Sequence, residues 1–165
     1  MTAAITGPPA ITPFLWFNDQ AEEAANFYIS VFGNGKILAI THDLDDPPGE
    51  PGTVMTVEFE LNGRRFVGIN GGPRFAFTEA VSFVIECANQ EQVDYFWDRL
   101  CADGGSESYC GWLKDKYGLS WQVTPVAMLE MIKSGDEKRS RAAMNAMFEM
   151  RKLDIATLQA AWNAA

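Results

Sequence analysis

The chain has 165 residues, of which 47% are hydrophobic, which is enough for one domain or two small modules with a buried core and argues against disorder. Its 22 acidic and 13 basic side chains give a formal net charge of -9, so we expect its surface to repel phosphates and to bind no nucleic acid. No segment approaches the roughly twenty apolar residues that span a bilayer, and residues 1–13 lack a signal-like pattern, so we expect no membrane contact. The three cysteines show neither disulfide nor metal spacing, which agrees with a cytoplasmic protein.

The first two predicted elements are a strand and an amphipathic helix. Residues 11–17 are aromatic and apolar without helical periodicity, which favours a strand. Asn18 or Asp19 can cap the next helix, with Glu22 in the position that a capping box prefers. Apolar residues then recur at three- and four-residue steps until Gly33 ends the helix.

Three strands should follow. Residues 36–41 form a short apolar strand, and residues 43–52 contain three prolines and should form a surface loop. Residues 55–61 alternate apolar and polar side chains, as a half-buried strand does. Asn62-Gly63 favours a tight two-residue turn, so residues 64–70 should pair back as the next strand.

The same order of signals then repeats. Residues 80–88 predict a strand, and Asn89 can cap a helix with Gln92 in the supporting position. The helix should run to Cys101 and end at Gly104-Gly105. This repetition indicates an internal duplication of one βαβββ module.

The second module should end with two strands, residues 106–113 and 119–124, joined by a turn at 114–118. After Pro125 the composition becomes helical, and three amphipathic helices are expected at residues 126–133, 137–150 and 155–162, with Asp154 as the cap of the last one. We expect this tail to pack on a sheet or on a partner subunit. The predicted fold is α+β, with modules at residues 1–79 and 80–125 and a helical C-terminal extension at 126–165, all in one structural domain.

A series of short motifs runs through the chain in order: residues 17–24 (FNDQAEEA), 27–28 (FY), 70–75 (NGGPRF), 79–83 (EAVSF), 110–115 (CGWLKD) and 120–125 (SWQVTP). The series resembles the PhnB-like branch of the glyoxalase/bleomycin-resistance superfamily, also called vicinal oxygen chelate proteins. Members often carry the name 3-demethylubiquinone-9 3-methyltransferase. The similarity is expected to cover nearly the whole chain, including the helical tail. It implies paired βαβββ modules, a homodimer, and a half-open barrel whose inner face holds a small molecule.

The resemblance also indicates where the ligand should bind. Metal-dependent superfamily members place His, Gln or Glu ligands on the first and last strands of each module. The corresponding positions here are Thr12, Gly68 or Asn70, Ser82 and Gln122. Hydroxyls, amides and a glycine make a poor transition-metal site, so we expect no catalytic metal and no cofactor. The expected ligand-binding residues are Thr12, Trp16, Asn70, Ser82, Cys110, Trp112 and Gln122.

The favoured functional hypothesis is a protein that binds a small organic molecule, aromatic or quinone-like. Indole rings provide flat apolar walls, and a few amide and hydroxyl groups can orient such a ligand. We expect Asn70, Trp112 and Gln122 to face the ligand. Strand alternation places Trp121 on the face opposite to Gln122. The single histidine, His42, has no convergent partner in the sequence and is interpreted as a solvated loop residue.

Two alternatives remain open. One is an enzyme, either a lyase or isomerase with Cys110 as nucleophile and Glu86 as base, or the methyltransferase of the family name. Neither side chain has a visible activating partner, so plain packing is the favoured interpretation. Cofactor folds also need a glycine turn from strand to helix, whereas residues 68–73 end in Pro73 and an aromatic stretch. The other alternative is a structural or regulatory dimer with an empty cleft.

Overall fold

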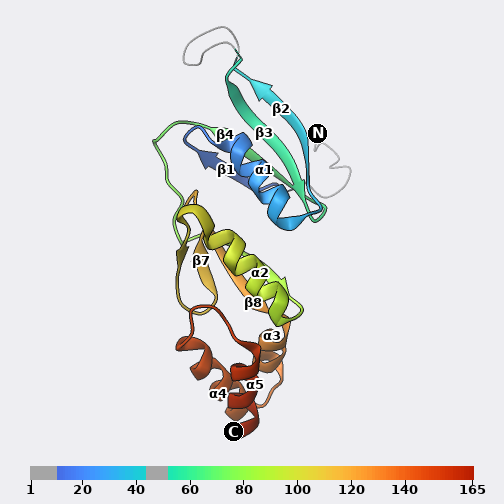
Figure 1. Cartoon of the computed structure of the whole chain (residues 1–165), viewed down its shortest axis with the longest axis vertical. Helices are drawn as coiled ribbons and strands as arrows, with labels where there is room; N and C mark the ends of the chain where they lie inside the picture. The colour runs from blue at the N-terminus through green and yellow to red at the C-terminus, as the bar shows by residue number, and fades with distance from the viewer. Residues whose placement is uncertain (1–10, 44–51) are drawn as a thin grey trace, which may run out of the picture. The chain divides into compact units, whose positions relative to one another are not determined.

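The computed structural model describes residues 11–43 and 52–165. The chain divides into two compact units between Ala76 and Phe77, and each unit contains one four-stranded sheet (Figure 1). The predicted loop over residues 43–52 lies almost wholly outside the described residues. No helix in the described ranges has the length and hydropathy of a membrane-spanning segment.

The first unit has the predicted βαβββ order. Its elements are β1 (Phe14–Phe17), α1 (Ala21–Phe32), β2 (Lys36–His42), β3 (Val54–Leu61) and β4 (Arg64–Asn70). The strand order is β1-β4-β3-β2, with β1 parallel to β4 and the other pairs antiparallel. The predicted turn is confirmed, because Asn62 and Gly63 both have positive φ, 50° and 75°.

Helix α1 covers one face of this sheet. Its buried side chains, among them Tyr28 and Val31, pack on Val57 and Phe59 of β3. The rings of Tyr28 and Phe59 stack with centroids 6.3 Å apart, and Phe59 stacks on Phe66 of β4 at 5.4 Å. Alternation sends the polar side chains of β3 to the opposite face, where Glu58 pairs with Arg65.

The start of α1 differs from the prediction. Gln20 is the N-cap residue and makes no side-chain capping bond, so a cap by Asn18 or Asp19 is wrong. The N–H of Ala21 instead donates to Oδ1 of Asn70, at 2.8 Å, from the end of β4. A side chain that is distant in sequence therefore satisfies one of the orphan donors of the helix. The other end is as predicted, with Gly33 in the left-handed conformation.

The second unit repeats the topology of the first. Its elements are β5 (Ser82–Cys87), α2 (Gln90–Cys101), the 3₁₀ turn η1 (Ala102–Gly104), β6 (Ser106–Glu107), β7 (Trp112–Lys114) and β8 (Ser120–Pro125). The strand order β5-β8-β7-β6 is that of the first unit, again with one parallel pair, β5 and β8. The predicted cap of α2 is confirmed, because Oδ1 of Asn89 accepts from the N–H of Gln92 at 2.9 Å.

The prediction of one strand over residues 106–113 is wrong. Two short strands, β6 and β7, are joined by a turn in which Cys110 and Gly111 have φ of 60° and 81°. The N–H groups of these two residues donate to the carbonyls of Met150 and Arg151, both at 2.8 Å. Contact with the C-terminal segment therefore fixes the turn, and the second module has all three strands after its helix.

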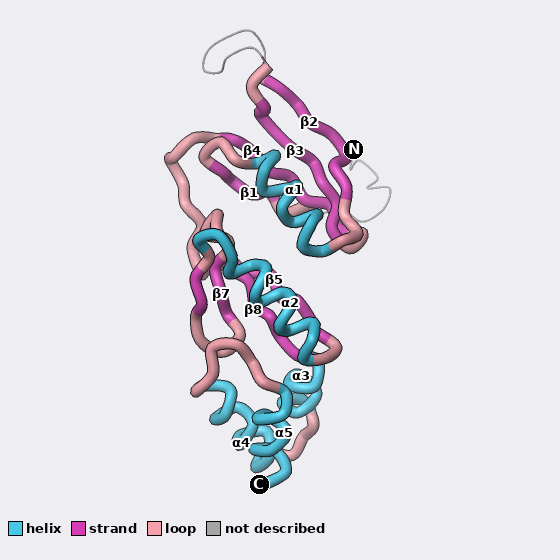
Figure 2. Tube along the Cα trace, in the orientation of Figure 1, coloured by secondary structure: helices cyan, strands magenta, loops and turns pink. Residues whose placement is uncertain are grey.

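The tail forms three helices, α3 (Val126–Lys133), α4 (Glu137–Phe148) and α5 (Ile155–Ala164), close to the predicted bounds. Figure 2 shows these helices gathered at one end of the second unit. They bury a small apolar cluster of their own: Met128, Met131, Ala143, Leu153 and Leu158. Oδ1 of Asp154 caps α5 by accepting from Thr157 at 2.7 Å, as predicted.

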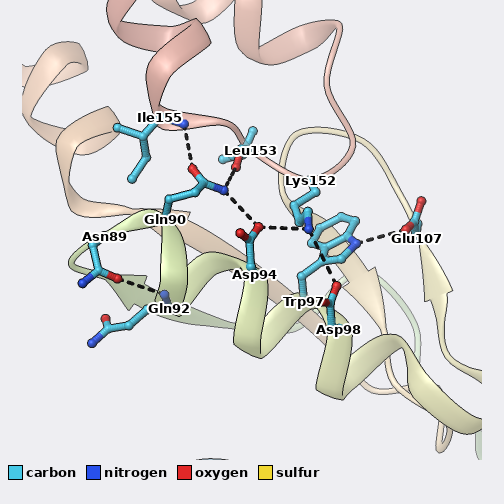
Figure 3. Close-up of polar contacts among 10 residues, drawn as sticks. All are labelled: Asn89, Gln90, Gln92, Asp94, Trp97, Asp98, Glu107, Lys152, Leu153 and Ile155. Atoms are coloured by element: carbon cyan, nitrogen blue, oxygen red, sulfur yellow. Dashed lines mark hydrogen bonds and ion pairs between the residues drawn. The ribbon is translucent and has the colours of Figure 1, made fainter.

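The tail docks on α2 through a polar network (Figure 3). Oε1 of Gln90 accepts from the N–H of Ile155 at 2.9 Å, and its Nε2 donates to the carbonyl of Leu153 at 3.1 Å. Nζ of Lys152 lies 2.9 Å from Oδ1 of Asp94. The Lys152 ammonium, and then the Gln90 amide, lower the pKa of Asp94. The pairing is therefore fully present above the unfolded-state pKa of an aspartate, about 4, and is lost as the pH falls through the lowered value.

We predict that Phe59→Ala destabilises the first unit by about 3–5 kcal/mol, because this ring is fully buried and its removal leaves a cavity. Phe83→Ala in the second unit should cost less, since that ring is only half-buried. Urea denaturation of both variants measures the difference. Equal losses would contradict the packing described above.

We also predict that Gln90→Ala loosens the tail. The substitution removes the partners of the Leu153 carbonyl and the Ile155 N–H, so local opening of α5 should become easier by about 1–3 kcal/mol. Amide hydrogen exchange of α5 measures this loss. The matched control is Gln159→Ala on the exposed side of α5, which should leave the exchange of Leu153 and Ile155 unchanged.

Candidate functional site

The candidate site lies on the face of the second sheet that α2 does not cover. Alternation along β5 sends Phe83, Ile85 and Cys87 toward α2, whose own buried residues include Val93 and Trp97. The opposite side is called the open face here. It carries Ser82, Val84 and Glu86 of β5, Ser120, Gln122 and Thr124 of β8, and Trp112 and Lys114 of β7.

Strand register arranges these side chains in rows. Ser82, Ser120 and Lys114 are direct neighbours across β5, β8 and β7, and we call them the polar row. Two residues further along each strand, Val84, Gln122 and Trp112 are neighbours, and we call them the indole row. Cross-strand neighbours share one face of a sheet, so both rows lie on the open face.

Three of the predicted site residues, Ser82, Trp112 and Gln122, are thus brought together. Nε2 of Gln122 donates to Oγ of Ser82 at 2.8 Å and links the two rows. Trp112 lies directly opposite Gln122 in the antiparallel pair of β7 and β8. The Gln122 amide and the Trp112 indole therefore place one polar group and one flat apolar surface side by side on the sheet.

Trp121 faces the other way, as alternation predicts. Its ring lies 5.6 Å from that of Phe83, and its Nε1 donates to Oδ2 of Asp115 at 2.8 Å. Asp115 is itself buried and accepts from the N–H groups of Tyr117 and Leu119 at 2.9 and 3.0 Å. The hydrogen bonds of Asp115 with Trp121, Tyr117 and Leu119 fix the turn between β7 and β8. They do so from the α2 side of the sheet, opposite to the open face.

Among the residues of the open face that sequence reasoning did not name, Ser120 and Lys114 are polar neighbours of Ser82. Ser120 is only 1% exposed, and its Oγ has no hydrogen-bond partner among the described residues. Nζ of Lys114 lies 2.6 Å from Oε1 of Glu79, and this ammonium lowers the pKa of Glu79. The signal was present in the sequence, because Ser120 and Gln122 are two positions apart on one strand and must share a face.

Asn70 does not lie where the prediction placed it. Strand register pairs Asn70 with Phe17, so both lie on the side of the first sheet that faces α1. Its Oδ1 caps Ala21, and its Nδ2 donates to the carbonyl of Val54 at 2.9 Å. Both polar atoms of this side chain thus hold the first unit together. Gly68, the alternative position, also faces α1, because a Cβ there would contact Ala21.

Trp16 lies on the uncovered side of the first sheet, beneath the segment that follows β4. Its Nε1 donates to the carbonyl of Gly72 at 2.9 Å, and its ring lies edge-on to Phe75 with centroids 5.0 Å apart. A Cβ at Gly71 would overlap the indole. Glycine is therefore needed at this position to make room for Trp16. Thr12 stands two residues before β1 and is half-buried.

The side chains named for catalysis come from different parts of the second unit. Cys110 sits in the turn that binds Met150, while Glu86 is exposed near the end of β5. His42 is the exposed last residue of β2, in the first unit. Burial raises the pKa of both Cys87 and Cys101 to about 11, which leaves these two thiols protonated and unreactive at neutral pH.

The described residues do not fit a transition-metal centre. They contain no group of three or more His, Cys, Asp or Glu side chains that could hold an ion. Of the positions that correspond to superfamily ligands, Asn70 faces α1, and Ser82 and Gln122 are neutral and bonded to each other. Such a donor set lacks the charge and imidazole groups that a stable site recruits.

A separate, open hollow of about 510 Å³ lies beside the starts of α2 and α5. None of the predicted site residues lines it. Its polar side chains already have protein partners: Asn89 and Asp154 cap helices, Gln90 docks the tail, and Gln159 donates to Asn163. The open face is the better candidate, because Ser120 on it has a polar atom that the described fold leaves unused.

Comparison with known proteins places this geometry in a family. A family model described as 3-demethylubiquinone-9 3-methyltransferase matches residues 9–124. A PhnB protein from Bacillus cereus is 37% identical, with a TM-score of 0.65, and the match covers 72% of this chain and 100% of that one. The match to the family model ends before α3, so the expectation that it includes the helical tail is wrong.

More distant structures share the fold. Protein PA1353 from Pseudomonas aeruginosa is 18% identical with a TM-score of 0.59, and the match covers 72% of this chain and 98% of that one. The fosfomycin resistance protein FosX from Mesorhizobium loti is 11% identical with a TM-score of 0.50, covering 70% and 89%. No curated protein sequence matches the chain.

We predict different stability losses for Asn70→Ala and Gln122→Ala. The first should cost about 1–3 kcal/mol, because the Ala21 N–H and the Val54 carbonyl both lose a part-buried partner. The second should cost less than about 1 kcal/mol, since only Ser82 loses a bond. Urea denaturation monitored by circular dichroism measures both. A larger loss for Gln122→Ala would mean that its amide is structural.

Proposed function

This chain belongs to the 3-demethylubiquinone-9 3-methyltransferase family, the PhnB-like branch of the glyoxalase/bleomycin-resistance superfamily, and on that basis we propose that it binds a small organic molecule with an aromatic or quinone-like ring. The proposed site is the open face of the second sheet. Binding needs no catalytic metal. A homodimer and a cytoplasmic location, both predicted from the sequence, belong to the same proposal.

One observation carries this proposal: Trp112 and Gln122 are direct neighbours on the open face, and Gln122 is bonded to Ser82. An indole offers a planar apolar surface, and an amide beside it can donate to a carbonyl or accept from a hydroxyl. Ligand sites of soluble proteins commonly combine apolar walls with a few such polar groups. Phenols and quinones match this combination.

The glycines near the end of β4 favour binding over the methyl transfer in the family name. Cofactor sites of the dinucleotide type need a glycine turn that leads from a strand into a helix. Here Gly71 and Gly72 lead from β4 into a loop: the small size of Gly71 makes room for Trp16, while Gly72 has a positive φ of 80° and its carbonyl accepts from the Trp16 indole. These glycines are therefore explained by packing within the first unit.

We predict that phenolic and quinone compounds raise the melting temperature of the protein, whereas Zn²⁺, Ni²⁺ and Mn²⁺ do not. Gln122→Ala and Trp112→Ala should each abolish most of the shift by organic compounds. A thermal shift screen of the native protein and both variants measures this. The matched control is Gln159→Ala, which removes an exposed amide from α5 and should keep the full response.

Stabilisation by a divalent metal at micromolar concentration would contradict the metal-free site. An organic shift that survives in both Gln122→Ala and Trp112→Ala would place the ligand elsewhere. No shift from any compound would favour the structural or regulatory dimer.

A further inference from the structure

We propose that the ligand carries an anionic oxygen group, such as an aromatic carboxylate, and that the polar row of Ser82, Ser120 and Lys114 binds it. This inference rests on the proposed function and specifies the class of its ligand. It follows from four features at or beside the open face: a buried hydroxyl without a partner, a neighbouring ammonium group, an exposed carboxylate that pairs with that ammonium, and an indole at a fixed spacing.

The first feature is the hydroxyl of Ser120. Its residue is 1% exposed, and among the described residues Oγ has no hydrogen-bond partner. Leaving a buried hydroxyl unpaired costs about 1–3 kcal/mol, and most buried polar atoms in folded proteins are paired. Asp115, another buried polar residue of this unit, differs from Ser120 in that it accepts three hydrogen bonds. The Ser120 hydroxyl therefore has no hydrogen bond among the described residues to give up when a ligand reaches it.

The second feature is the charge next to that hydroxyl. Register places Lys114 on one side of Ser120 and Ser82 on the other, so an ammonium and two hydroxyls line one row. Charge-assisted hydrogen bonds to oxyanions are shorter and stronger than neutral ones. Because the whole chain carries a formal charge of -9, a local cation is required to hold an anion on this surface.

The third feature is the carboxylate that already uses this cation. Oε1 of Glu79, in the segment before β5, lies 2.6 Å from Nζ of Lys114. Glu79 is exposed, so water can replace its contact at little cost and an anionic ligand can compete with it. The ion pair thus shows that a carboxylate fits at Lys114.

The spacing of the rows specifies the rest of the molecule. Trp112 lies two residues before Lys114 on β7, a distance of about 7 Å along a strand. A ligand that contacts both must hold its charge several ångströms from the centre of its ring system. Naphthoate and related aryl carboxylates have this shape, whereas free phosphate does not reach the indole.

The test compares 2-naphthoate with 2-naphthamide, which have the same rings but differ in charge. Dissociation constants are measured by ligand-observed NMR for the native protein and for variants. We expect naphthoate to bind at least several-fold more tightly than naphthamide. Lys114→Met should weaken naphthoate roughly tenfold or more and leave naphthamide unchanged, because only the acid uses the charge. Lys114→Arg should keep most of the naphthoate affinity.

Two further variants address the hydroxyl and the competing carboxylate. Ser120→Ala should weaken naphthoate several-fold without lowering the melting temperature of the free protein, because the hydroxyl has no partner to lose. Glu79→Gln should tighten naphthoate by freeing Lys114. The control is Lys133→Met at the exposed end of α3, which makes the same change in net charge and should affect neither ligand.

The outcomes separate this inference from the proposed function. Equal binding of acid and amide, lost in Gln122→Ala, would overturn the anion site and leave the aromatic binding site in place. Equal weakening of naphthoate by Lys114→Met and Lys133→Met would overturn it too, because the effect would then come from net charge alone. Absence of binding by both compounds, together with a negative phenol and quinone screen, would overturn both proposals.

Discussion

A single helix packs on each four-stranded sheet, and one helix can cover only one of the two faces of a sheet. Strand alternation then sorts the side chains, so apolar residues such as Phe59 and Val123 lie beneath the helix and their neighbours in sequence point away from it. The face of the second sheet that α2 does not cover receives hydroxyl, amide, ammonium and indole groups. This asymmetry decides the composition of the candidate site, because a residue one position away on β8 would belong to the core.

Features that depend on neighbouring residues could be predicted from the sequence. The βαβββ order followed from hydrophobic periodicity, the hairpin from Asn62-Gly63, and the caps of α2 and α5 from Asn89 and Asp154. Each depends on interactions that span only a few residues. For the same reason alternation alone separated Gln122 from Trp121, and the structure places them on opposite faces of β8 as expected.

Features that depend on distant residues could not be predicted. An asparagine side chain could bind a ligand, but Asn70 lies next to the first residue of α1. Its Oδ1 accepts from the N–H of Ala21, which is 49 positions away in the sequence. The strand expected at residues 106–113 breaks at Cys110-Gly111 because Met150 and Arg151 accept hydrogen bonds there. The polar row likewise requires the register of three strands, which no local pattern specifies.

The polar side chains of the second unit fall into two groups with different uses. Gln90 of α2 has both amide atoms bonded to the tail or to Asp94, and buried Asp115 accepts from three donors, so these side chains are fully occupied in holding the fold. Ser120 is as deeply buried as Asp115 but has no partner among the described residues. The fold gains nothing in stability from this unpaired hydroxyl, since alanine at the same place would avoid the cost of burying it. The anionic ligand proposed above would supply this hydroxyl, between Lys114 and Ser82 on the open face, with the acceptor that the described residues do not provide.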